Sequence, residues 1–196
     1  MSLIRNVSVG NWPTDLFHRL QTATPATVFE SRFTYDLVPL LWQTTTASGA
    51  TVAHVPLNGC ARAAITSTLG SKVVLQTYQY HHYQPGRAHQ IRMTFMAPWA
   101  VNSTARMRVG YFDDANGVFY ERVGSTHYFV VRKTINSVLS EERVAQASWS
   151  IDKLNGFGPS GVTLDGSFPQ ILLIDAQWLG VGSVLFGFDI DGQAAY

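Results

Sequence analysis

Charged side chains are scarce in this chain of 196 residues. Asp, Glu, Lys and Arg make up 14% of it and the formal net charge is +1, whereas ordinary globular proteins carry about 25% charged residues. A nearly neutral chain offers no electrostatic attraction to nucleic acid or to an anionic membrane, so we predict neither as a partner. Such a weakly charged surface suits a protein that packs against copies of itself or against other proteins.

Cysteines and long apolar runs are also rare. Cys60 is the single cysteine, which excludes an intrachain disulfide and a cysteine cluster for zinc. No run approaches the roughly 20 apolar residues of a transmembrane helix. The chain begins MSLIRNVSVGNWP, which lacks the apolar stretch of an ordinary signal peptide. We therefore expect a protein that folds in a cytoplasm without disulfides.

Helical periodicity is short and lies near the beginning of the chain. The segment DLFHRL places Leu16, Phe17 and Leu20 on one helical face, but a helix of one or two turns is marginal alone. We predict that residues 1–26 form an N-terminal arm or lead-in without a core of its own. Its predicted partner contacts are Trp12, Leu16 and Phe17.

From residue 27 onward, apolar and polar side chains alternate with a period of two. This pattern is typical of half-buried antiparallel strands, and the lack of helical segments between them disfavours parallel βαβ units. We predict an all-β domain over 27–196, an antiparallel two-sheet β-sandwich of jelly-roll or lectin-like type. The expected strands are ESRFTYD, TVAHV, ARAAITS, KVVLQTYQY, HQIRMTFMA, ARMRVGYF, GVFYERV, HYFVVRK, QILLIDAQW and GSVLFGFDI.

An acidic cluster interrupts the stretch GYFDDANGVFYERVG, which runs from Gly110 to Gly124. Asn-Gly is a strong hairpin signal because both residues tolerate positive φ, and aspartates before a turn commonly bond nearby backbone amides. The alternative is a calcium site formed by Asp113, Asp114 and Asn116. Calcium takes about six to eight oxygens, and this spacing fits no established calcium loop. We favour the hairpin and predict no metal site.

A long glycine-rich connection, WSIDKLNGFGPSGVTLD, runs from Trp149 to Asp165. Loops longer than about a dozen residues are usually functional or bound to a partner. A phosphate-binding loop would be followed by a helix, but here a strand follows. We therefore predict a protein interface formed by five consecutive residues of this loop, Asn155, Gly156, Phe157, Gly158 and Pro159.

No catalytic group emerges from the titratable residues. His81 and His82 are adjacent, and adjacent strand residues point to opposite faces, so they do not share a metal ion. A Gly-x-Ser-x-Gly elbow is missing, and Asp175, the best candidate for glycosidase chemistry, has no evident carboxylate mate. We predict no enzymatic activity, no catalytic residue and no cofactor.

Aromatic residues flanked by amides leave open a role in sugar binding. Sugar rings stack on aromatic faces without needing charge, and in this interpretation Tyr78, Tyr80, Tyr83 and Trp99 form a glycan platform. The competing interpretation is that these rings fill the core and the subunit contacts. We favour the competing interpretation.

Four stretches carry a resemblance to a known family. They are YQYHHYQPGR, RVGYFDDANGVFYE, VAQASWSIDKLNGFGPSGVTLD and DAQWLGVGSVLFGFDIDG. With the ordered motifs YQPG, GYFD..NG, DKL.G.GPSG and QWLGVG, the chain from Phe29 to Gly192 resembles a family of tailed-bacteriophage virion structural proteins. The resemblance implies a head-associated or fibre-type component without enzymatic activity. The chain departs from the family pattern locally, at Ser150, Gly166 and Ser183.

These features together predict a non-enzymatic virion structural protein, which is a capsid decoration or cement subunit or a fibre-like subunit. The expected partners are major capsid or tail proteins and further copies of the chain in a closed, for example trimeric, homo-oligomer. The expected location is the virion, assembled in the bacterial host cytoplasm. The alternative is a tail receptor-binding or carbohydrate-binding module that recognises a host surface glycan.

Overall fold

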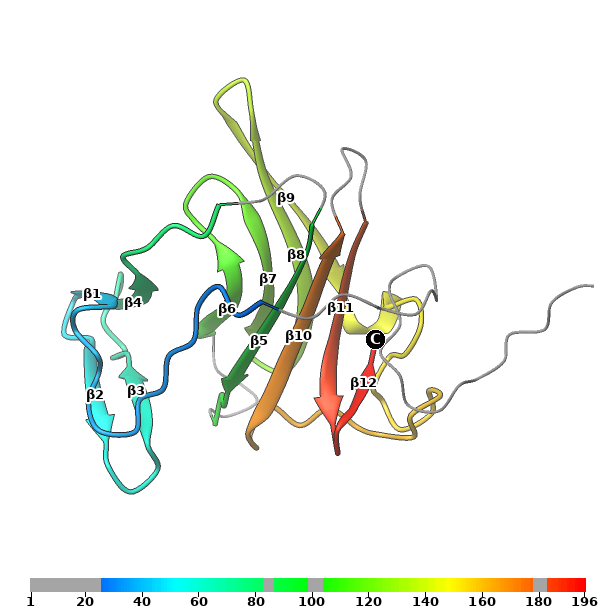
Figure 1. Ribbon diagram of the computed structural model, residues 1–196, viewed down its shortest axis with the longest axis horizontal. Helices are drawn as coiled ribbons and strands as arrows, with labels where there is room; N and C mark the ends of the chain where they lie inside the picture. Colours follow the sequence, from blue (N-terminus) through cyan, green and yellow to red (C-terminus); the bar gives the residue numbers. More distant parts are fainter. Residues whose placement is uncertain (1–25, 83–86, 99–103, 178–182) are drawn as a thin grey trace, which may run out of the picture. The chain divides into compact units, whose positions relative to one another are not determined.

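The fold is all-β, as the alternating pattern predicts. A computed structural model describes residues 26–82, 87–98, 104–177 and 183–196, and in this part of the chain it contains strands, one short 3-10 turn and no α-helix that could span a membrane (Figure 1). The elements are β1 (Trp42–Ala47), β2 (Thr51–Val55), β3 (Cys60–Ala64), β4 (Lys72–Thr77), β5 (Ala88–Phe95), β6 (Arg106–Phe112), β7 (Gly117–Val123), β8 (Thr126–Ile135), β9 (Val138–Ala145), the turn η1 (Gln146–Ser148), β10 (Gln170–Gln177), β11 (Ser183–Ile190) and β12 (Gln193–Ala195).

The chain divides into two compact units. Among the described residues, the first unit covers 26–82 and the second covers those from 87 onward. We call the described residues of the first, 26–82, the N-terminal unit, and all later described residues the sandwich unit. The domain predicted over 27–196 therefore covers both units.

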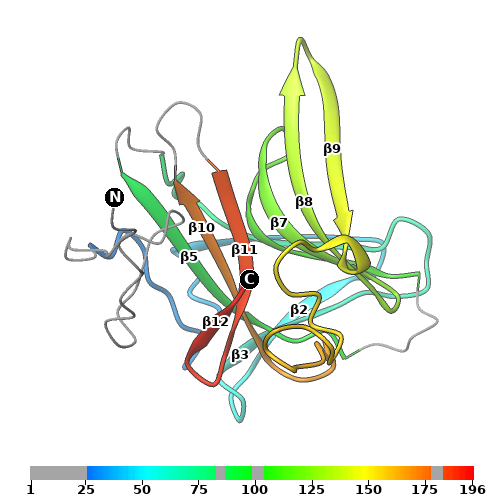
Figure 2. The same ribbon diagram turned by 90° about the vertical axis from the view of Figure 1, so that its right-hand side faces the viewer.

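The sandwich unit consists of two antiparallel four-stranded sheets with the strand orders β12-β11-β10-β5 and β6-β7-β8-β9. Figure 2 shows the two sheets facing each other, with β5, β10 and β11 in one and β7, β8 and β9 in the other. The chain leaves the first sheet after β5, forms the second sheet as a meander, and returns to place β10 beside β5. The predicted antiparallel two-sheet sandwich is confirmed. Consecutive hairpins join β6 to β9 and β10 to β12, while β5 pairs with β10 after the long excursion through the second sheet, in place of the two Greek keys of a jelly roll.

Side chains from both sheets and from the connection before β10 form one hydrophobic core. Tyr120, Leu172, Ile174 and Phe188 are all fully buried. The ring of Phe129 stacks on Trp149 with 4.1 Å between ring centres. Burying one large apolar side chain stabilises a fold by about 1.5–3 kcal/mol, so these residues account for much of the stability of the sandwich unit.

Tight turns set the register of the second sheet. Asp113 begins the β6–β7 turn, where its Oδ1 accepts hydrogen bonds from the backbone N–H groups of Ala115 (2.7 Å) and Asn116 (2.6 Å). The predicted hairpin is confirmed, and Gly117, with φ +134°, starts β7. A Cβ at Gly117 would lie 2.3 Å from the Cα of Phe112, which is why this position requires glycine. The β8–β9 hairpin extends beyond its neighbours (Figure 1).

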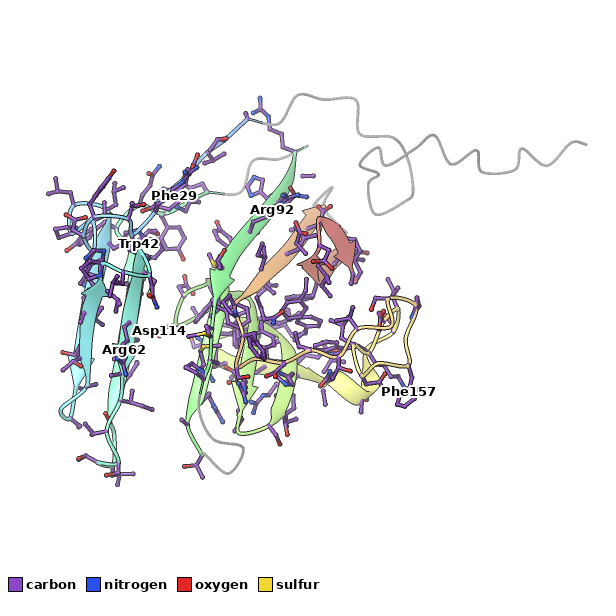
Figure 3. The ribbon with its side chains drawn as sticks, turned by 90° about the horizontal axis from the view of Figure 1, so that it is seen from below. Phe29, Trp42, Arg62, Arg92, Asp114 and Phe157 are labelled. Carbon is purple, nitrogen blue, oxygen red and sulfur yellow. The ribbon has the colours of Figure 1, made fainter. Side chains whose placement is uncertain are left out.

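The N-terminal unit contains two separate two-stranded antiparallel sheets, β1-β4 and β2-β3. Trp42 holds the preceding irregular segment, because its ring lies 5.2 Å from that of Phe33 and its Nε1–H donates to Ser31 Oγ at 2.8 Å. Figure 3 shows Phe29 next to Trp42. Two-stranded sheets are marginal in water, so this unit depends on contacts beyond its own strand pairs.

Most of the predicted strands are present, and one is wrong. Residues 30–36 (ESRFTYD) do not form a strand: 30–33 are irregular and 34–36 form a bend. The ring of Phe33 packs on Trp42 while Tyr35, two residues later, is 91% exposed, so the two rings do not share the buried face that a strand would give them. The structure also has three strands without a predicted counterpart. They are the threonine-rich β1, the charged β9 and the short β12.

Candidate interaction surfaces

A buried carboxylate organises the loop between Trp149 and Asp165. The carboxylate of Asp152, which is 3% exposed, accepts hydrogen bonds from the N–H groups of Leu154 (2.8 Å) and Ser160 (2.7 Å). Burial by itself raises the pKa of Asp152, but these hydrogen bonds and one from the Ser160 hydroxyl lower it overall. A Cβ at Gly158 would lie 1.9 Å from Asp152 Oδ1, so only glycine lets the backbone pass this close to the carboxylate.

Backbone pairing fixes the stem of the same loop. Asn155 and Thr163 form an isolated antiparallel bridge, and Gly156 N–H donates to Val162 O at 2.9 Å. Leu154, at the base of the stem, is 1% exposed and packs in the hydrophobic core. The loop is therefore an ordered projection anchored in the sandwich unit.

The tip of this loop presents an aromatic side chain to solvent. Phe157 is 94% exposed and projects away from the sheets (Figure 3). An open hollow of about 350 Å³ lies beside it, lined by Trp149, Ser150, Ile151, Lys153, Asn155, Phe157 and Gly158. Of the five predicted interface residues, Asn155 and Gly156 belong to the paired stem and Phe157, Gly158 and Pro159 follow them toward the tip; the glycines are half-buried, and Asn155, Phe157 and Pro159 are exposed.

The N-terminal unit exposes many large apolar side chains. Ala50 is its one buried residue among the described residues 26–82. Leu57 and Leu69 are 98% and 97% exposed. We call the following residues the apolar surface of the N-terminal unit: Val28, Tyr35, Leu40, Leu41, Leu57, Ile65, Leu69, Tyr78 and Tyr80. With so many apolar side chains exposed and one residue buried, the described part of this unit removes little apolar area from water by its own contacts.

The predicted glycan platform is described in part. Tyr78 and Tyr80 are each 62% exposed, and the ring of Tyr80 lies 5.7 Å from that of His82. Tyr83 and Trp99 lie outside the described residues, as do the predicted arm contacts Trp12, Leu16 and Phe17. The platform stays a prediction.

A polar cluster lies at one end of the sandwich core. His127 is 6% exposed, and its Nδ1 is paired with the hydroxyl of Tyr120 at 2.5 Å. Burial, and then the nearby Arg122, lower the pKa of His127 to about 4, although Asp165 opposes this shift. Arg122 donates to the backbone oxygens of Ala97 and Gly124. These bonds satisfy polar groups that would otherwise be costly to bury.

The remaining titratable candidates are dispersed. Asp175 is 4% exposed on β10, on the face opposite the core, and its cross-strand neighbours are Gln90 and Leu185. The ring of His81 packs against Phe29. Among the described residues, no group of three or more His, Cys, Asp or Glu side chains is arranged to hold a metal ion.

Two surfaces have no counterpart among the predicted site residues. One is the apolar surface of the N-terminal unit, apart from Tyr78 and Tyr80. Its signal in the sequence is weak, since Leu57 and Leu69 fall in turns and not in an alternating strand. The other is a group of arginines on the second sheet. The hairpin at Asp113–Asn116 could have revealed it, because that turn places Arg108 opposite Glu121.

Comparisons with known proteins add no relative to this description. The sequence matches no family model, and neither a curated protein nor a solved structure matches the chain.

Proposed function

We propose that the chain is a non-enzymatic structural protein of a tailed-bacteriophage virion, acting as a capsid decoration or cement subunit or as a fibre-like subunit. The observation that supports this most strongly is the apolar surface of the N-terminal unit. Among its described residues this segment has four strands and one buried residue, so it gains little from its own core, and in this proposal contacts with another chain stabilise it.

Further copies of the chain are the partners that we propose for this apolar surface. Side chains such as Leu40, Leu57 and Leu69 are at least 90% exposed, and each would contribute about 1.5–3 kcal/mol if a neighbour buried it. The costs of association offset part of this gain. In a closed oligomer, for example a trimer, every copy makes the same contacts, so no copy is left with its apolar surface exposed.

The exposed loop tip suits contact with a second virion protein, such as a major capsid or tail protein. Phe157 is a single aromatic side chain on an anchored loop, and aromatic anchors commonly dominate the energy of protein interfaces. In this proposal the N-terminal unit joins the copies to one another, and the loop tip attaches the oligomer to the particle. Assembly takes place in the cytoplasm of the bacterial host.

Light scattering on the purified chain and co-sedimentation with particles that lack it test this function. We expect a discrete oligomer that sediments with the particles. A strict monomer that does not bind particles would refute the proposal.

The second candidate is a tail receptor-binding or carbohydrate-binding module that recognises a host surface glycan. The exposure of Tyr78 and Tyr80 favours it, since aromatic faces bind sugar rings by stacking. A glycan array tests it with the wild type and the variants Tyr78→Ala, Tyr80→Ala, Tyr83→Ala and Trp99→Ala. No bound sugar, or binding that all four substitutions leave intact, removes this candidate.

A further inference from the structure

Arginines gather on the outer face of the second sheet, which is the face opposite the core. Tyr120 and Phe129 point into the core, so the alternate residues of the same strands point outward. The outer face carries four arginines, here called the arginine cluster, which are Arg106 and Arg108 on β6, Arg132 on β8 and Arg143 on β9. Cross-strand register places Arg108 opposite Glu121, and Arg132 opposite Glu141.

Glu121 is fully buried at the centre of this face. Its Oε1 lies 2.8 Å from Arg108 Nε and 3.3 Å from Arg106 Nε, and its Oε2 pairs with Arg143 Nη2. A buried carboxylate is tolerated when charged hydrogen-bond partners surround it. Three guanidinium groups therefore converge on one carboxylate.

Aromatic rings contact the guanidinium groups and hold them in place. Arg108 and Arg132 lie 5.2 Å and 5.1 Å from the ring centre of Phe119, which is fully buried. Arg143 lies 4.8 Å from the ring centre of Tyr128. Such cation–π contacts favour one position of each cation, so the donors of the arginine cluster are preorganised.

The arginine cluster and its acidic partners together carry more positive than negative charge. Glu141 pairs with Arg132 at 2.7 Å and with Arg108 at 3.5 Å. Together with Glu121 it supplies two negative charges against four positive ones. Burial, and then the neighbouring Arg106 and Arg108, lower the pKa of Arg143, in keeping with a local excess of positive charge.

Two members of the arginine cluster reach solvent. The side chains of Arg106 and Arg143 are 47% and 31% exposed, that of Arg108 is 25% exposed, and that of Arg132 is 6% exposed. In the described part of the chain, Glu121 is the one acidic group within ion-pair distance of Arg106 or Arg143. Each guanidinium has five N–H donors, so both side chains have donors left for an external acceptor.

We propose that Arg106, Arg108 and Arg143 form a binding site for an oxyanion, and that its occupant is a carboxylate of an acidic segment on a partner protein. This rests on the proposed function, because it gives the chemistry of one contact that a structural subunit makes. The surplus of about two charges suits one or two carboxylates, which guanidinium groups bind bidentately. A net charge of +1 for the whole chain gives no long-range attraction for an extended polyanion.

Isothermal titration calorimetry on the full chain tests the site. The probes are an acetylated tetraglutamate peptide, a tetraglutamine peptide of the same length and a sulfated disaccharide, all at one ionic strength. We expect tetraglutamate to bind about tenfold more tightly than tetraglutamine, as charge-assisted hydrogen bonds predict. Equal binding of the two peptides would overturn the site, and tighter binding of the sulfated disaccharide would overturn the assignment to a protein partner.

Matched variants locate the binding. The double variant Arg106→Gln/Arg143→Gln should lose most of the preference for tetraglutamate, and the single variant Arg106→Gln, at a side chain 47% exposed, should lose part of it. Arg32→Gln is the control, since Arg32 is 79% exposed and pairs with Glu30 in the other unit. An undiminished preference for tetraglutamate over tetraglutamine in both the single and the double variant would refute the site. If the chain forms an oligomer but does not bind tetraglutamate, the site is refuted and the proposed function is not. If the chain is a monomer that binds tetraglutamate, the proposed function is refuted and the site is not.

Discussion

The two units of this chain have similar strands but very different interiors. In the sandwich unit, large side chains such as Phe188 and Leu172 are fully buried between two sheets. In the N-terminal unit, Leu57 and Leu69 are almost fully exposed, and Ala50 is the one buried residue described. One unit therefore has the core of an independent domain, and the other has strand pairs without a core.

The difference shows that strand formation and stability have separate causes. Backbone pairing needs suitable turns and extended residues, and both units have these. Stability needs apolar area removed from water, and the N-terminal unit obtains little of it from its own residues. We infer that intermolecular contacts complete the N-terminal unit, while the sandwich unit is complete by itself.

The largest expected effect contrasts a core residue with an exposed one. Phe188→Ala, at a fully buried position, should lower the free energy of unfolding by about 3–5 kcal/mol. Leu57→Ala, at a position 98% exposed, should change it by less than about 0.5 kcal/mol in the dissociated chain. Urea unfolding at high dilution measures both values. Similar losses in the two variants would remove the contrast between the units.

The pH dependence of unfolding sharpens the comparison, because the sandwich unit contains a buried neutral histidine. The pKa of His127 is about 4, below its ordinary value of about 6.5, so the unfolded chain binds the proton more tightly. The stability that this shift contributes is complete above about pH 6.5 and is lost as the pH falls toward 4, by at most about 3 kcal/mol.

Urea unfolding between pH 7 and 4 measures this dependence. His127→Gln should flatten the slope between about pH 6.5 and 4, whatever its effect on the stability at pH 7. His54→Gln is the control, since His54 belongs to the N-terminal unit, where its Nε2 is paired with Phe33 O at 2.8 Å. An unchanged slope in His127→Gln would contradict the burial of a neutral imidazole.

A pair of glycines in one loop gives a smaller effect. At Gly158 an added Cβ would lie 1.9 Å from Asp152 Oδ1, whereas at Gly161 nothing lies within 4 Å and φ is +66°. We expect Gly158→Ala to cost about 1–3 kcal/mol, as overpacking does, and Gly161→Ala to cost about 1 kcal/mol or less from the backbone alone. Thermal unfolding of the two variants checks this order, and the reverse order would show that Asp152 does not organise the loop.

The smallest effect on stability is expected at the loop tip. Phe157→Ala should leave the free energy of unfolding within about 0.5 kcal/mol of the wild type, because the side chain is 94% exposed. It should still weaken association with particles, since an aromatic anchor is lost. Co-sedimentation with the wild type as reference measures this, and unchanged association would exclude the tip as the particle contact.

The sequence predicted the sandwich unit well because its strands alternate clearly. GVFYERV and HYFVVRK fall within β7 and β8, and the aspartate-led turn between β6 and β7 is where the pattern placed it. The strands without a predicted counterpart have other compositions. β1 (WQTTTA) has no apolar alternation, and in β9 (VLSEERVA) all but two residues are exposed, so burial does not impose the pattern there.

The surfaces were harder to predict than the strands. Asn155 to Pro159 could be predicted as an exposed tip from glycine and proline alone, because these residues mark turns. The arginine cluster depends on cross-strand register, which brings Arg108 and Arg143 to one carboxylate from strands far apart in the sequence. The apolar surface of the N-terminal unit depends on a missing core, which no local pattern reveals.

Hydrogen exchange at two protein concentrations tests most directly whether neighbouring copies complete the N-terminal unit. In the intact chain, amides of β1 to β4 should gain protection as the concentration rises and the oligomer forms, while amides of β7 and β10 should keep the same strong protection throughout. Protection of β1 to β4 that is as strong as in β10 and independent of concentration would contradict this account.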